Sequence, residues 1–599
     1  MAAMKRALIP AIVLIATATL TIRAQNAKPA ARPAAAKPFT VVEATIPEMR
    51  AALEQKRVTS RQIVQQYLQR IGMYEDRLHA TITVNPNALK TADERDRERA
   101  AGRIRGPLHG IPIALKDNVQ TTFIRTTGGA LAFENLIPPY DATLTKNLID
   151  AGAIVIAKTG MTELANWVAG APTPMPGNYN AVGGQGYNPY DPRKDPREAT
   201  FDGRPALQTG GSSSGVGTAA NFWAGNVGSE TSGSILSPSN ANMLAGIKPT
   251  IGRVSRYGVI PITADQDTAG PMAKSVSDVA IMLGAMEGAE PDPNDPATTR
   301  CTPPANRDYT VFLRRDGLKG ARIGIPRAFF YDRITPPGEP TQSADTGRGG
   351  GREGRGGRGG RGGGGLSDPQ KKAMDDAIAV LKREGAIIVD PANIPSIVNP
   401  DPKENFVRWG QCSGDTNAKG KDENCSVVLK YGMKRDFNKW LASLGAAAPF
   451  KTLGDLIAWN KAHEKAGSIK YGQSNLEISD EMDVERDKRR YEADRAKDIR
   501  LSATNGIDAV MKSERLDAIL FPGANGAAIA AKPGYPTVTV PFAMIPNDPT
   551  PPFPAGFDAK PGPVGVSFTG MACSEPKLLE LAYAFEQATK KRIPPPQFP

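Results

Sequence analysis

A short apolar run followed directly by a lysine most restricts the folds open to this chain. Residues 110–115 are almost uniformly apolar, which is typical of a strand buried on both faces. Farther along, residues 141–152 have the pattern of a helix, and residues 153–157 follow it as a second apolar strand. Because buried strands alternate with helices, the sequence predicts an α/β fold.

The first residues have the composition of a secretory signal peptide. Lys5 and Arg6 precede an apolar stretch within residues 1–24, and the small residue Ala24 is suited to cleavage. An uncleaved N-terminal anchor is the alternative, but the stretch contains Pro10 and is short for a stable span. We therefore expect a periplasmic or secreted protein without a stable membrane span.

The rest of the chain divides by composition into four segments. They are a Pro/Ala-rich linker (25–38), the first part of the folded body (39–335), a Pro-rich and then Gly/Arg-rich disordered insertion (336–366) and the second part of the body (367–599). Two helices are clearly signalled in the body. One covers residues 60–72 with Ser60 as its N-cap, and the other begins after the N-cap Ser367.

The net charge of +12 lies largely outside the folded body. The leader holds three basic residues and the Gly/Arg tract has a net charge of +4, which leaves +5 for everything else. An arginine-rich tract can bind RNA, but export away from nucleic acid favours a solvated, disordered insertion, so no nucleic-acid partner is expected. Three His, four Cys and the lack of His-Glu-x-x-His or Cys-x-x-Cys motifs exclude most His- or Cys-built metal sites.

Residues 210–234 combine glycines and serines with large apolar side chains. Glycine permits tight turns, and such turns can direct several backbone N–H groups at a small anion. A flexible Gly/Ser linker is the alternative. A linker would not contain apolar residues that must pack somewhere: Val216, Ala219, Phe222, Trp223 and Val227.

Lys116 directly follows the buried strand. A lysine that is partly desolvated has a lowered pKa and can act as a neutral base. On spacing alone, the simpler interpretation is favoured, in which Lys116 pairs with Asp117 and stays charged.

Together these segments resemble the motifs of the amidase signature family. Gly-Ile-Pro-Ile-Ala-Leu-Lys-Asp-Asn (110–118) is similar to its lysine motif. Gly-Gly-Ser-Ser-Ser-Gly (210–215) and Gly-Ser-Glu-Thr-Ser-Gly-Ser-Ile (228–235) are similar to its serine motifs. The ordered similarity covers roughly residues 40–595. Further matching stretches are Gly-Gly-Gln (183–185), Asn-Pro-Tyr-Asp-Pro (188–192), Gly-Ile-Lys-Pro-Thr (246–250), Gln-Asp-Thr-Ala-Gly-Pro-Met (266–272), Thr-Leu-Gly-Asp-Leu-Ile-Ala-Trp-Asn (452–460) and Pro-Val-Gly-Val-Ser-Phe-Thr-Gly (563–570).

The resemblance implies an amidase-signature fold, with one large mixed β-sheet flanked by helices on both faces, and a Ser–Ser–Lys triad. It makes Ser234 the nucleophile, Ser212 the bridging serine on a cis peptide bond, and Lys116 the base. A serine hydroxyl is a weak nucleophile until a neighbour takes its proton, and a bridging hydroxyl can relay that proton to a neutral amine. The same relay can return the proton to the leaving amine.

The resemblance also implies an oxyanion hole made of backbone N–H groups. Two departures from the family pattern affect this region. The stretch between the serine motifs is about two residues shorter than expected, so Ser213 remains open as a bridging or supporting residue. A serine also stands at position 232, where many members have glycine. In addition to these two departures, an unusual insertion near residues 193–208 is a candidate for lining the substrate entrance. The oxyanion residues are Thr231, Ser232, Gly233 and Ser234.

Two other motifs point to different enzymes. Gly-Ser-Ser-Ser-Gly (211–215) matches the nucleophile elbow of α/β-hydrolases, which requires a later histidine. Only His463 follows, in an expected helix over residues 453–465, where a surface or packing role is favoured. Ser574-x-x-Lys577 and Lys-Thr-Gly (158–160) are similar to motifs of penicillin-binding enzymes, but their order is reversed.

Two of the four cysteines have a sequence signal for pairing. Cys412 and Cys425 lie close together in a polar segment, and export permits disulfides. We therefore predict a bridge between them. Cys301 and Cys573 have no comparable signal, and four free thiols are the alternative.

The sequence thus predicts an exported amidase that hydrolyses a carboxamide C–N bond through a serine acyl-enzyme and needs no metal or organic cofactor. A small-molecule or peptide amide is the expected substrate. The motifs are most similar to those of peptide-amidase-like members, which remove terminal amide groups, whereas export disfavours the family members that serve tRNA-dependent amidotransferases. The alternative is a catalytically inactive amidase-like scaffold that binds amides or polyanions. No sequence feature indicates the oligomeric state.

Overall fold

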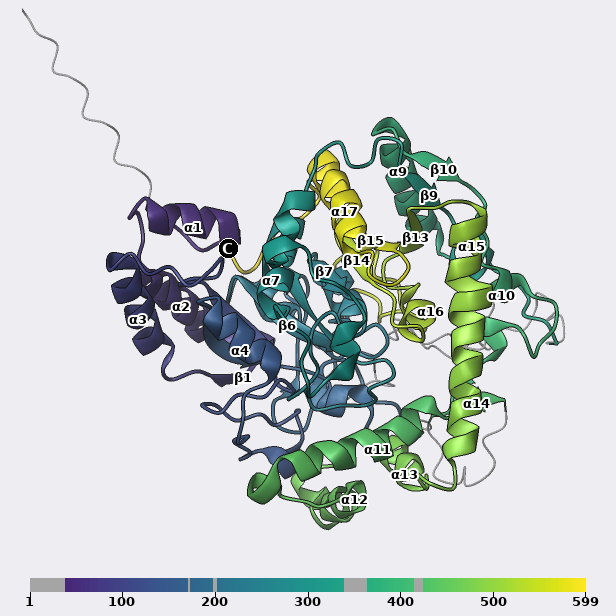
Figure 1. Cartoon of the computed structure of the whole chain (residues 1–599), viewed down its shortest axis with the longest axis horizontal. Helices are drawn as coiled ribbons and strands as arrows, with labels where there is room; N and C mark the ends of the chain where they lie inside the picture. Colours follow the sequence, from purple (N-terminus) through teal and green to yellow (C-terminus); the bar gives the residue numbers. More distant parts are fainter. Residues whose placement is uncertain (1–37, 171–172, 198–201, 339–363, 414–423) are drawn as a thin grey trace, which may run out of the picture. The chain divides into compact units, whose positions relative to one another are not determined.

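The computed structural model is built around one mixed β-sheet (Figure 1). It describes residues 38–170, 173–197, 202–338, 364–413 and 424–599, of which residues 40–599 belong to one unit. Within these residues the sheet has eleven strands. In spatial order they are β1 (Thr81–Val84), β3 (Ile154–Thr159), β2 (Pro112–Lys116), β6 (Gly225–Glu230), β8 (Thr268–Ala273), β7 (Ala245–Lys248), β14 (Thr537–Ile545), β15 (Gly562–Thr569), β13 (Ala518–Pro522), β9 (Arg322–Gly324) and β10 (Ile387–Val389).

Strand direction changes across the sheet. β2 is parallel to both of its neighbours, β3 and β6. β13, β9 and β10 form a second parallel group at the other edge. The pairs between and outside these groups are antiparallel. The prediction of a mixed sheet in an α/β fold is therefore confirmed.

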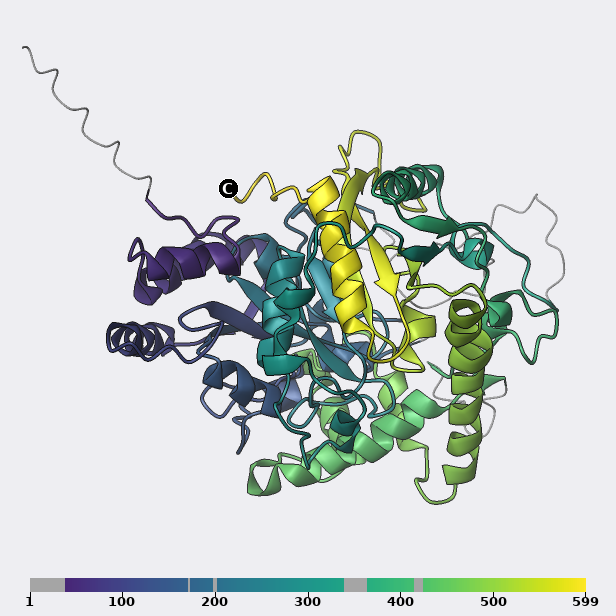
Figure 2. The same cartoon turned by 45° about the horizontal axis from the view of Figure 1, so that its top comes forward.

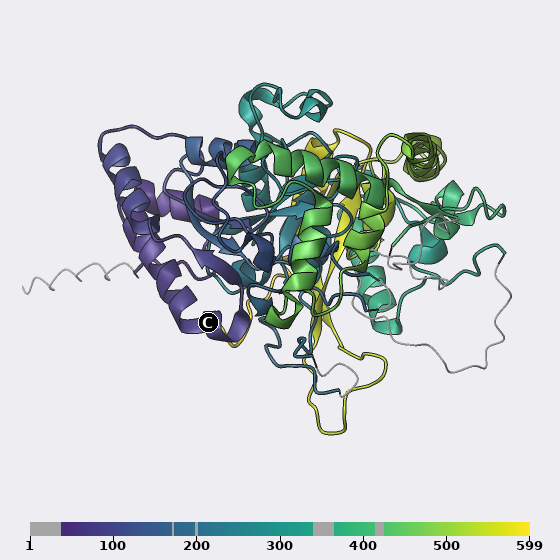
Figure 3. The same cartoon turned by 90° about the horizontal axis from the view of Figure 1, so that it is seen from below.

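Helices cover the sheet on both faces. α4, α7, α9 and α17 lie along one face (Figures 1 and 2), and α6 packs against β7, β14 and β15. α11, α12 and α13 lie across one end of the sheet, as Figure 3 shows from below. The helices are α1 (Ile46–Glu54), α2 (Ser60–Leu78), α3 (Ala88–Ala100), α4 (Thr143–Asp150), α5 (Val216–Ala219), α6 (Leu236–Ala241), α7 (Val276–Met286), α8 (Arg327–Phe330), α9 (Asp368–Arg383), α10 (Pro395–Val398), α11 (Val428–Ser443), α12 (Leu453–Ala462), α13 (Ser474–Asp480), α14 (Lys488–Ile499), α15 (Asp508–Ser513), α16 (Ala527–Ala531) and α17 (Glu575–Thr589).

Two pairs of very short strands lie outside the main sheet. They are β4 (Tyr179–Asn180) with β5 (Gly184–Gln185), and β11 (Gly410–Gln411) with β12 (Cys425–Ser426). In the part of the chain that the structure describes, no helix combines the length and the apolar content that a membrane crossing would need.

The strands and helices expected from the apolar pattern are present with small shifts. β2 begins two residues later than predicted and includes Lys116, and all of its residues are buried. α9 begins after Ser367, as predicted. α2 begins at Ser60, but its N-cap is Thr59, whose side chain accepts from the N–H of Gln62. Thr59 and Gln62 form a capping box, and the N–H of Ser60, the first residue of the helix, donates to Asp96.

Both cysteine pairs form disulfides. Cys412–Cys425 confirms the prediction, with 5.1 Å between the two Cα atoms. Cys301–Cys573 was not predicted, because its partners are 272 residues apart and meet only through the tertiary fold. The predicted signal peptide, nearly all of the linker, and residues 339–363 of the insertion lie outside the described residues.

A large aromatic and aliphatic core joins α11 and α12 to the loops that follow the N-terminal strands. Phe133 contacts Phe437, Trp440 and Phe450 edge to face. The same cluster contains Trp167 and Leu429. Burial of these side chains therefore fixes two distant segments beside the carboxyl ends of β2 and β6.

Candidate active site

The carboxyl ends of two parallel strands bring the predicted lysine and serine motifs together. Lys116 is the last residue of β2, and Ser229 is the penultimate residue of the adjacent strand β6. In open α/β sheets, ligands bind preferentially at this end of the parallel strands. The loop with Ser212 and the turn that follows β6 approach the same point.

The side chain of Lys116 is fully buried and has three contacts. Its Nζ lies 3.0 Å from Ser212 Oγ, 3.0 Å from Ser229 Oγ and 3.1 Å from Ser229 O. The amide of Asn118 donates to Ser229 Oγ at 2.9 Å. Ser229 and Asn118 lie inside the quoted motifs, but no role was predicted for them. Their place opposite Lys116 depends on the pairing of β2 with β6.

Burial lowers the pKa of Lys116 to about 7, from an ordinary value of 10.5. The negative charges of Asp267 and Glu230 act in the opposite direction and limit the shift. A neutral amine has two N–H donors and one lone pair. With Lys116 neutral, Nζ must therefore be the acceptor in one of its three hydrogen bonds. The hydroxyl of Ser212 can be the donor of that bond.

The simpler interpretation, in which Lys116 pairs with Asp117, is wrong. Asp117 is fully buried, and its carboxylate accepts from the N–H and the hydroxyl of Thr127. Its charged neighbour is Lys158 on β3, with 3.9 Å between Nζ and Oδ1. Because successive side chains of an extended chain point to opposite sides, Lys116 and Asp117 have different partners.

Ser212 and Ser213 have different environments. Ser212 is the one whose hydroxyl contacts Lys116, at 3.0 Å. Ser213 Oγ donates to the carbonyl of Ser229 at 3.0 Å and accepts from its N–H at 3.2 Å. The hydroxyl of Ser213 therefore links the two serine motifs through hydrogen bonds to the backbone of Ser229.

The cis peptide bond implied by the resemblance before Ser212 is absent. In the described residues, the cis bonds precede Pro391 and Pro551. A cis bond before a residue other than proline costs roughly 3 kcal/mol, so the trans form is the ordinary one.

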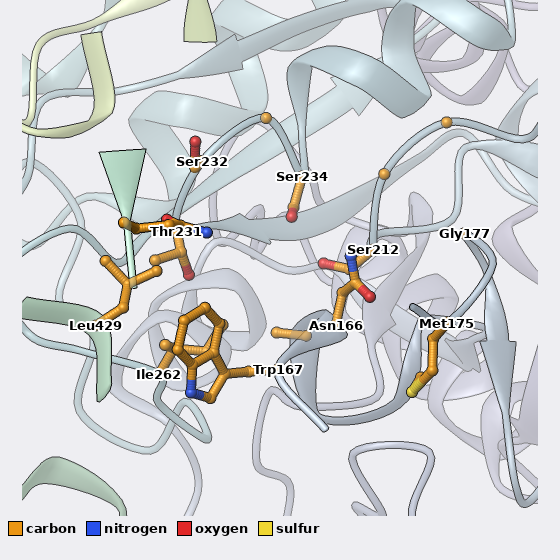
Figure 4. A pocket seen from close by; sticks show the side chains of 15 residues that line it. Asn166, Trp167, Met175, Gly177, Ser212, Thr231, Ser232, Ser234, Ile262 and Leu429 are labelled. Carbon is orange, nitrogen blue, oxygen red and sulfur yellow. The ribbon is translucent and has the colours of Figure 1, made fainter. Parts of the chain in front are cut away.

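Ser234 lies in the turn after β6 and is 9% exposed. No hydrogen bond joins its hydroxyl to that of Ser212 within the described residues, but the N–H of Ser213 donates to its carbonyl at 3.2 Å. Gly211 makes the approach possible, because a Cβ there would lie 3.0 Å from the Cα of Ser234. Figure 4 shows that the side chains of Ser212 and Ser234 both point into one pocket.

The turn at residues 231–234 lines the same pocket. Gly233 has a φ of 91°, a conformation that glycine adopts without strain. Among the described residues, no intramolecular acceptor faces the N–H groups of the four predicted oxyanion residues. Ser232 is half-exposed, and the turn is formed with serine at that position.

Gln266 and Asp267, which directly precede the neighbouring strand β8, hold this turn. Asp267 accepts from the hydroxyl of Thr231 at 2.5 Å, and Gln266 donates to the carbonyl of Thr231 at 3.2 Å. Asp267 also accepts from the N–H groups of Ile262 and Thr263, at 2.8 and 3.0 Å. One carboxylate therefore connects the turn to a segment of the pocket wall.

The wall that faces the serines is mostly apolar (Figure 4). This wall was not predicted, because its residues are scattered along the chain and carry no motif. Each is an ordinary buried or half-buried side chain when only its own segment is considered. The wall residues are Trp167, Met175, Ile262, Gln411 and Leu429.

The competing α/β-hydrolase motif is not assembled. His463 is exposed and stacks on Trp459, with 3.9 Å between the ring centroids.

The insertion near residues 193–208 does not line this pocket in its described part. Arg197 and Arg193 donate instead to the carbonyls of Pro551 and Asp558, so the insertion packs on the connection between β14 and β15.

Comparison with known proteins places this geometry in a family. The family model described as Amidase matches residues 62–340. A protein of Arabidopsis thaliana named as a probable amidase is 32% identical over 93% of this chain and 92% of its own length. The similarity to this relative therefore extends well beyond the segment that the family model matches.

Solved structures of other proteins are also similar to this chain over almost its whole length. The native peptide amidase of Stenotrophomonas maltophilia has a TM-score of 0.74 and 35% sequence identity, over 93% of this chain and 99% of that one. An amidase family protein of Bacillus anthracis has a TM-score of 0.72 and 29% identity, over 93% of this chain and 92% of that one. The sheet, the order of the motifs and the likeness to known amidases lead to one assignment. The chain belongs to the amidase signature family and is an amidase-type hydrolase.

Proposed function

We propose that this protein hydrolyses a carboxamide C–N bond through an acyl-enzyme on Ser234, with Ser212 as the proton relay and Lys116 as the base. The observation that carries the proposal is the contact of 3.0 Å between Lys116 Nζ and Ser212 Oγ at a fully buried lysine. The pKa of about 7 supports it, since about half of the lysine is neutral at pH 7.

In the first half-reaction, Ser234 Oγ attacks the amide carbonyl carbon. Its proton passes to Ser212 Oγ, while the proton of Ser212 passes to Lys116 Nζ. The carbonyl oxygen becomes an anion, to which the N–H groups of residues 231–234 can donate hydrogen bonds. When the C–N bond breaks, the ammonium of Lys116 returns a proton through Ser212 to the leaving nitrogen.

In the second half-reaction, water replaces the amine. The same relay takes a proton from water as the oxygen attacks the ester carbonyl, and it returns that proton to Ser234 as the acid leaves. The contact between Ser212 and Ser234 that this step needs is expected to tighten when substrate is bound, because catalytic hydrogen bonds are often long in a free enzyme.

Peptide amides are the substrates we propose to test first. The likeness to the peptide amidase of Stenotrophomonas maltophilia supports this choice. The apolar wall of Trp167, Met175, Ile262 and Leu429 supports it as well, since it suits an apolar side chain beside the carboxamide.

A fluorophosphonate probe and an ammonia-release assay test the function together. The parent protein should release ammonia from peptide amides and should be labelled covalently on Ser234. Ser234→Ala should abolish both signals. A parent protein that is neither labelled nor active on peptide amides, aryl anilides or aliphatic amides would instead support the inactive scaffold that binds amides or polyanions.

We also propose that the protein is exported after cleavage of residues 1–24. The composition of those residues supports this, and so do the two disulfides, which persist in oxidising compartments. Mass spectrometry of the N-terminal peptide in the periplasmic and extracellular fractions tests it. A mature chain that begins at Gln25 is expected, and full-length chain confined to the cytoplasm would contradict export.

A further inference from the structure

Two residues of the pocket wall lie on either side of a disulfide loop. Gln411 directly precedes Cys412, and Leu429 follows Cys425 by four residues. Both line the pocket that contains Ser212 and Ser234. The Cys412–Cys425 disulfide is therefore a covalent cross-link next to two residues that line the same pocket as Ser234.

The ribbon formed by β11 and β12 is too short to be stable alone. Only two residue pairs form it, Gly410 with Cys425 and Gln411 with Ser426, and the N–H of Cys412 adds a bond of 2.9 Å to the carbonyl of Ser426. Even a longer isolated two-stranded ribbon is marginally stable in water. Further attachments must hold Gln411 in the wall.

A buried carboxylate supplies one attachment. Asp498 on α14 is fully buried, and it accepts from Trp409 Nε1 and from Ser426 Oγ, both at 2.8 Å. Its charge is paired with Lys532. Asp498 therefore holds Ser426 of β12 and Trp409, which directly precedes β11. The disulfide holds Cys412, which directly follows β11. Gln411 lies between these two attachments.

The same loop leads into the apolar part of the wall. Cys412 packs in a buried cluster with Val427, Tyr431 and Met482. Tyr431 of α11 stacks on Tyr491 of α14, with 4.2 Å between the centroids. Because α11 starts three residues after Cys425, the disulfide also restrains the first turn of that helix, which includes Leu429.

The chemistry of this wall suits one kind of substrate group. Leu429 and Ile262 are each 4% exposed and apolar. The side chain of Gln411 is half-buried and has no hydrogen-bond partner among the described residues, so its amide can donate to or accept from a peptide group. An N-acylated amino-acid amide with a bulky apolar side chain presents both features.

We propose that the Cys412–Cys425 disulfide positions Gln411 and Leu429 as specificity-determining residues, so that the pocket selects amides with a bulky apolar acyl portion over small aliphatic amides. This inference rests on the proposed function, because it requires turnover at Ser234. It concerns the selection of substrate and not the proton relay.

The test compares two disulfide variants of the full chain on two substrates. Cys412→Ser/Cys425→Ser removes the bridge beside the pocket, and Cys301→Ser/Cys573→Ser is the matched control that removes the other bridge. Kinetic constants are measured for N-acetyl-phenylalaninamide and for propionamide. For the first variant, kcat/KM should fall about tenfold on the aromatic amide, through KM, and change less than about twofold on propionamide. The control should keep the parental ratio.

Single substitutions keep the proposal testable if the first variant does not fold. Gln411→Ala and Leu429→Ala leave the bridge intact and should each lower the ratio of the two kcat/KM values, again through KM. The midpoint of the pH profile of kcat/KM should stay near pH 7, because neither substitution touches Lys116 or Ser212. An unchanged ratio in these variants, or an equal change in the control, overturns the proposal. Parental turnover in Ser234→Ala would instead overturn the proposed function.

Discussion

The amino group of Lys116 and the hydroxyl of Ser212 lie 3.0 Å apart in a place where both side chains are almost completely buried. Lysine is rarely buried without a charged partner in contact. Here its contacts are hydroxyl and carbonyl oxygens, and the negative charges that act on it come from Asp267 and Glu230 without a direct ion pair. This arrangement favours a neutral amine near pH 7.

The first prediction is the pH dependence of hydrolysis. The base must be neutral, so kcat/KM should rise with pH through the pKa of Lys116, about 7 in the folded protein against 10.5 ordinarily. The midpoint should therefore lie near pH 7, with a plateau above about pH 8. Lys116→Arg should be inactive at every pH, since guanidinium does not lose its proton in proteins. A pH–rate profile between pH 5 and 10 measures this, and a midpoint near 10 would contradict it.

The second prediction separates the two adjacent serines. Ser212→Ala should lower kcat by roughly two to four orders of magnitude, which is the range for lost acid–base catalysis. Ser213→Ala should reduce activity less and lower the free energy of unfolding by roughly 1–3 kcal/mol, because the N–H of Ser229 loses its acceptor. Turnover and chemical denaturation of both variants test this. A larger activity loss in Ser213→Ala would assign the relay to Ser213.

The sequence predicted the parts of the site that lie on contiguous motifs and could not predict the rest. Lys116 and Ser212 were named because each lies in a contiguous segment that resembles a family motif, whereas the local pattern alone favoured a charged Lys116 paired with Asp117. Leu429 was missed because it is one apolar residue of an amphipathic helix, and its position beside Ser234 depends on the packing of α11 against Trp167. The pairing of Cys301 with Cys573 was missed for the same reason.

The third prediction concerns the two disulfides. In the chain-entropy model, a bridge stabilises more when it closes a longer loop. Cys301–Cys573 spans 272 residues and Cys412–Cys425 spans 13. Removing the first bridge should lower the free energy of unfolding by about 6 kcal/mol, and removing the second by about 3 kcal/mol. Denaturant titration of the two double-serine variants measures the order, and a reversed order would show that strain or residual structure dominates.

The last prediction tests Asp267, which accepts hydrogen bonds from the hydroxyl of Thr231 in the predicted oxyanion turn and from the N–H of Ile262 in the pocket wall. Asp267→Asn should lower the plateau of kcat roughly tenfold, since the turn loses a charged acceptor. It should also move the midpoint of the pH profile to lower pH, because the negative charge of Asp267 raises the pKa of Lys116.

Asp278→Asn is a matched control for this change. Asp278 is also buried, and burial raises its pKa to about 6, as it does for Asp267. Its carboxylate accepts from the N–H of Ile46 and is not among the charges that shift the pKa of Lys116. The control should therefore lose stability but keep the parental midpoint. If Asp267→Asn lowers kcat without any shift of the midpoint, Asp267 supports only the shape of the turn, and its charge does not set the proton affinity of Lys116.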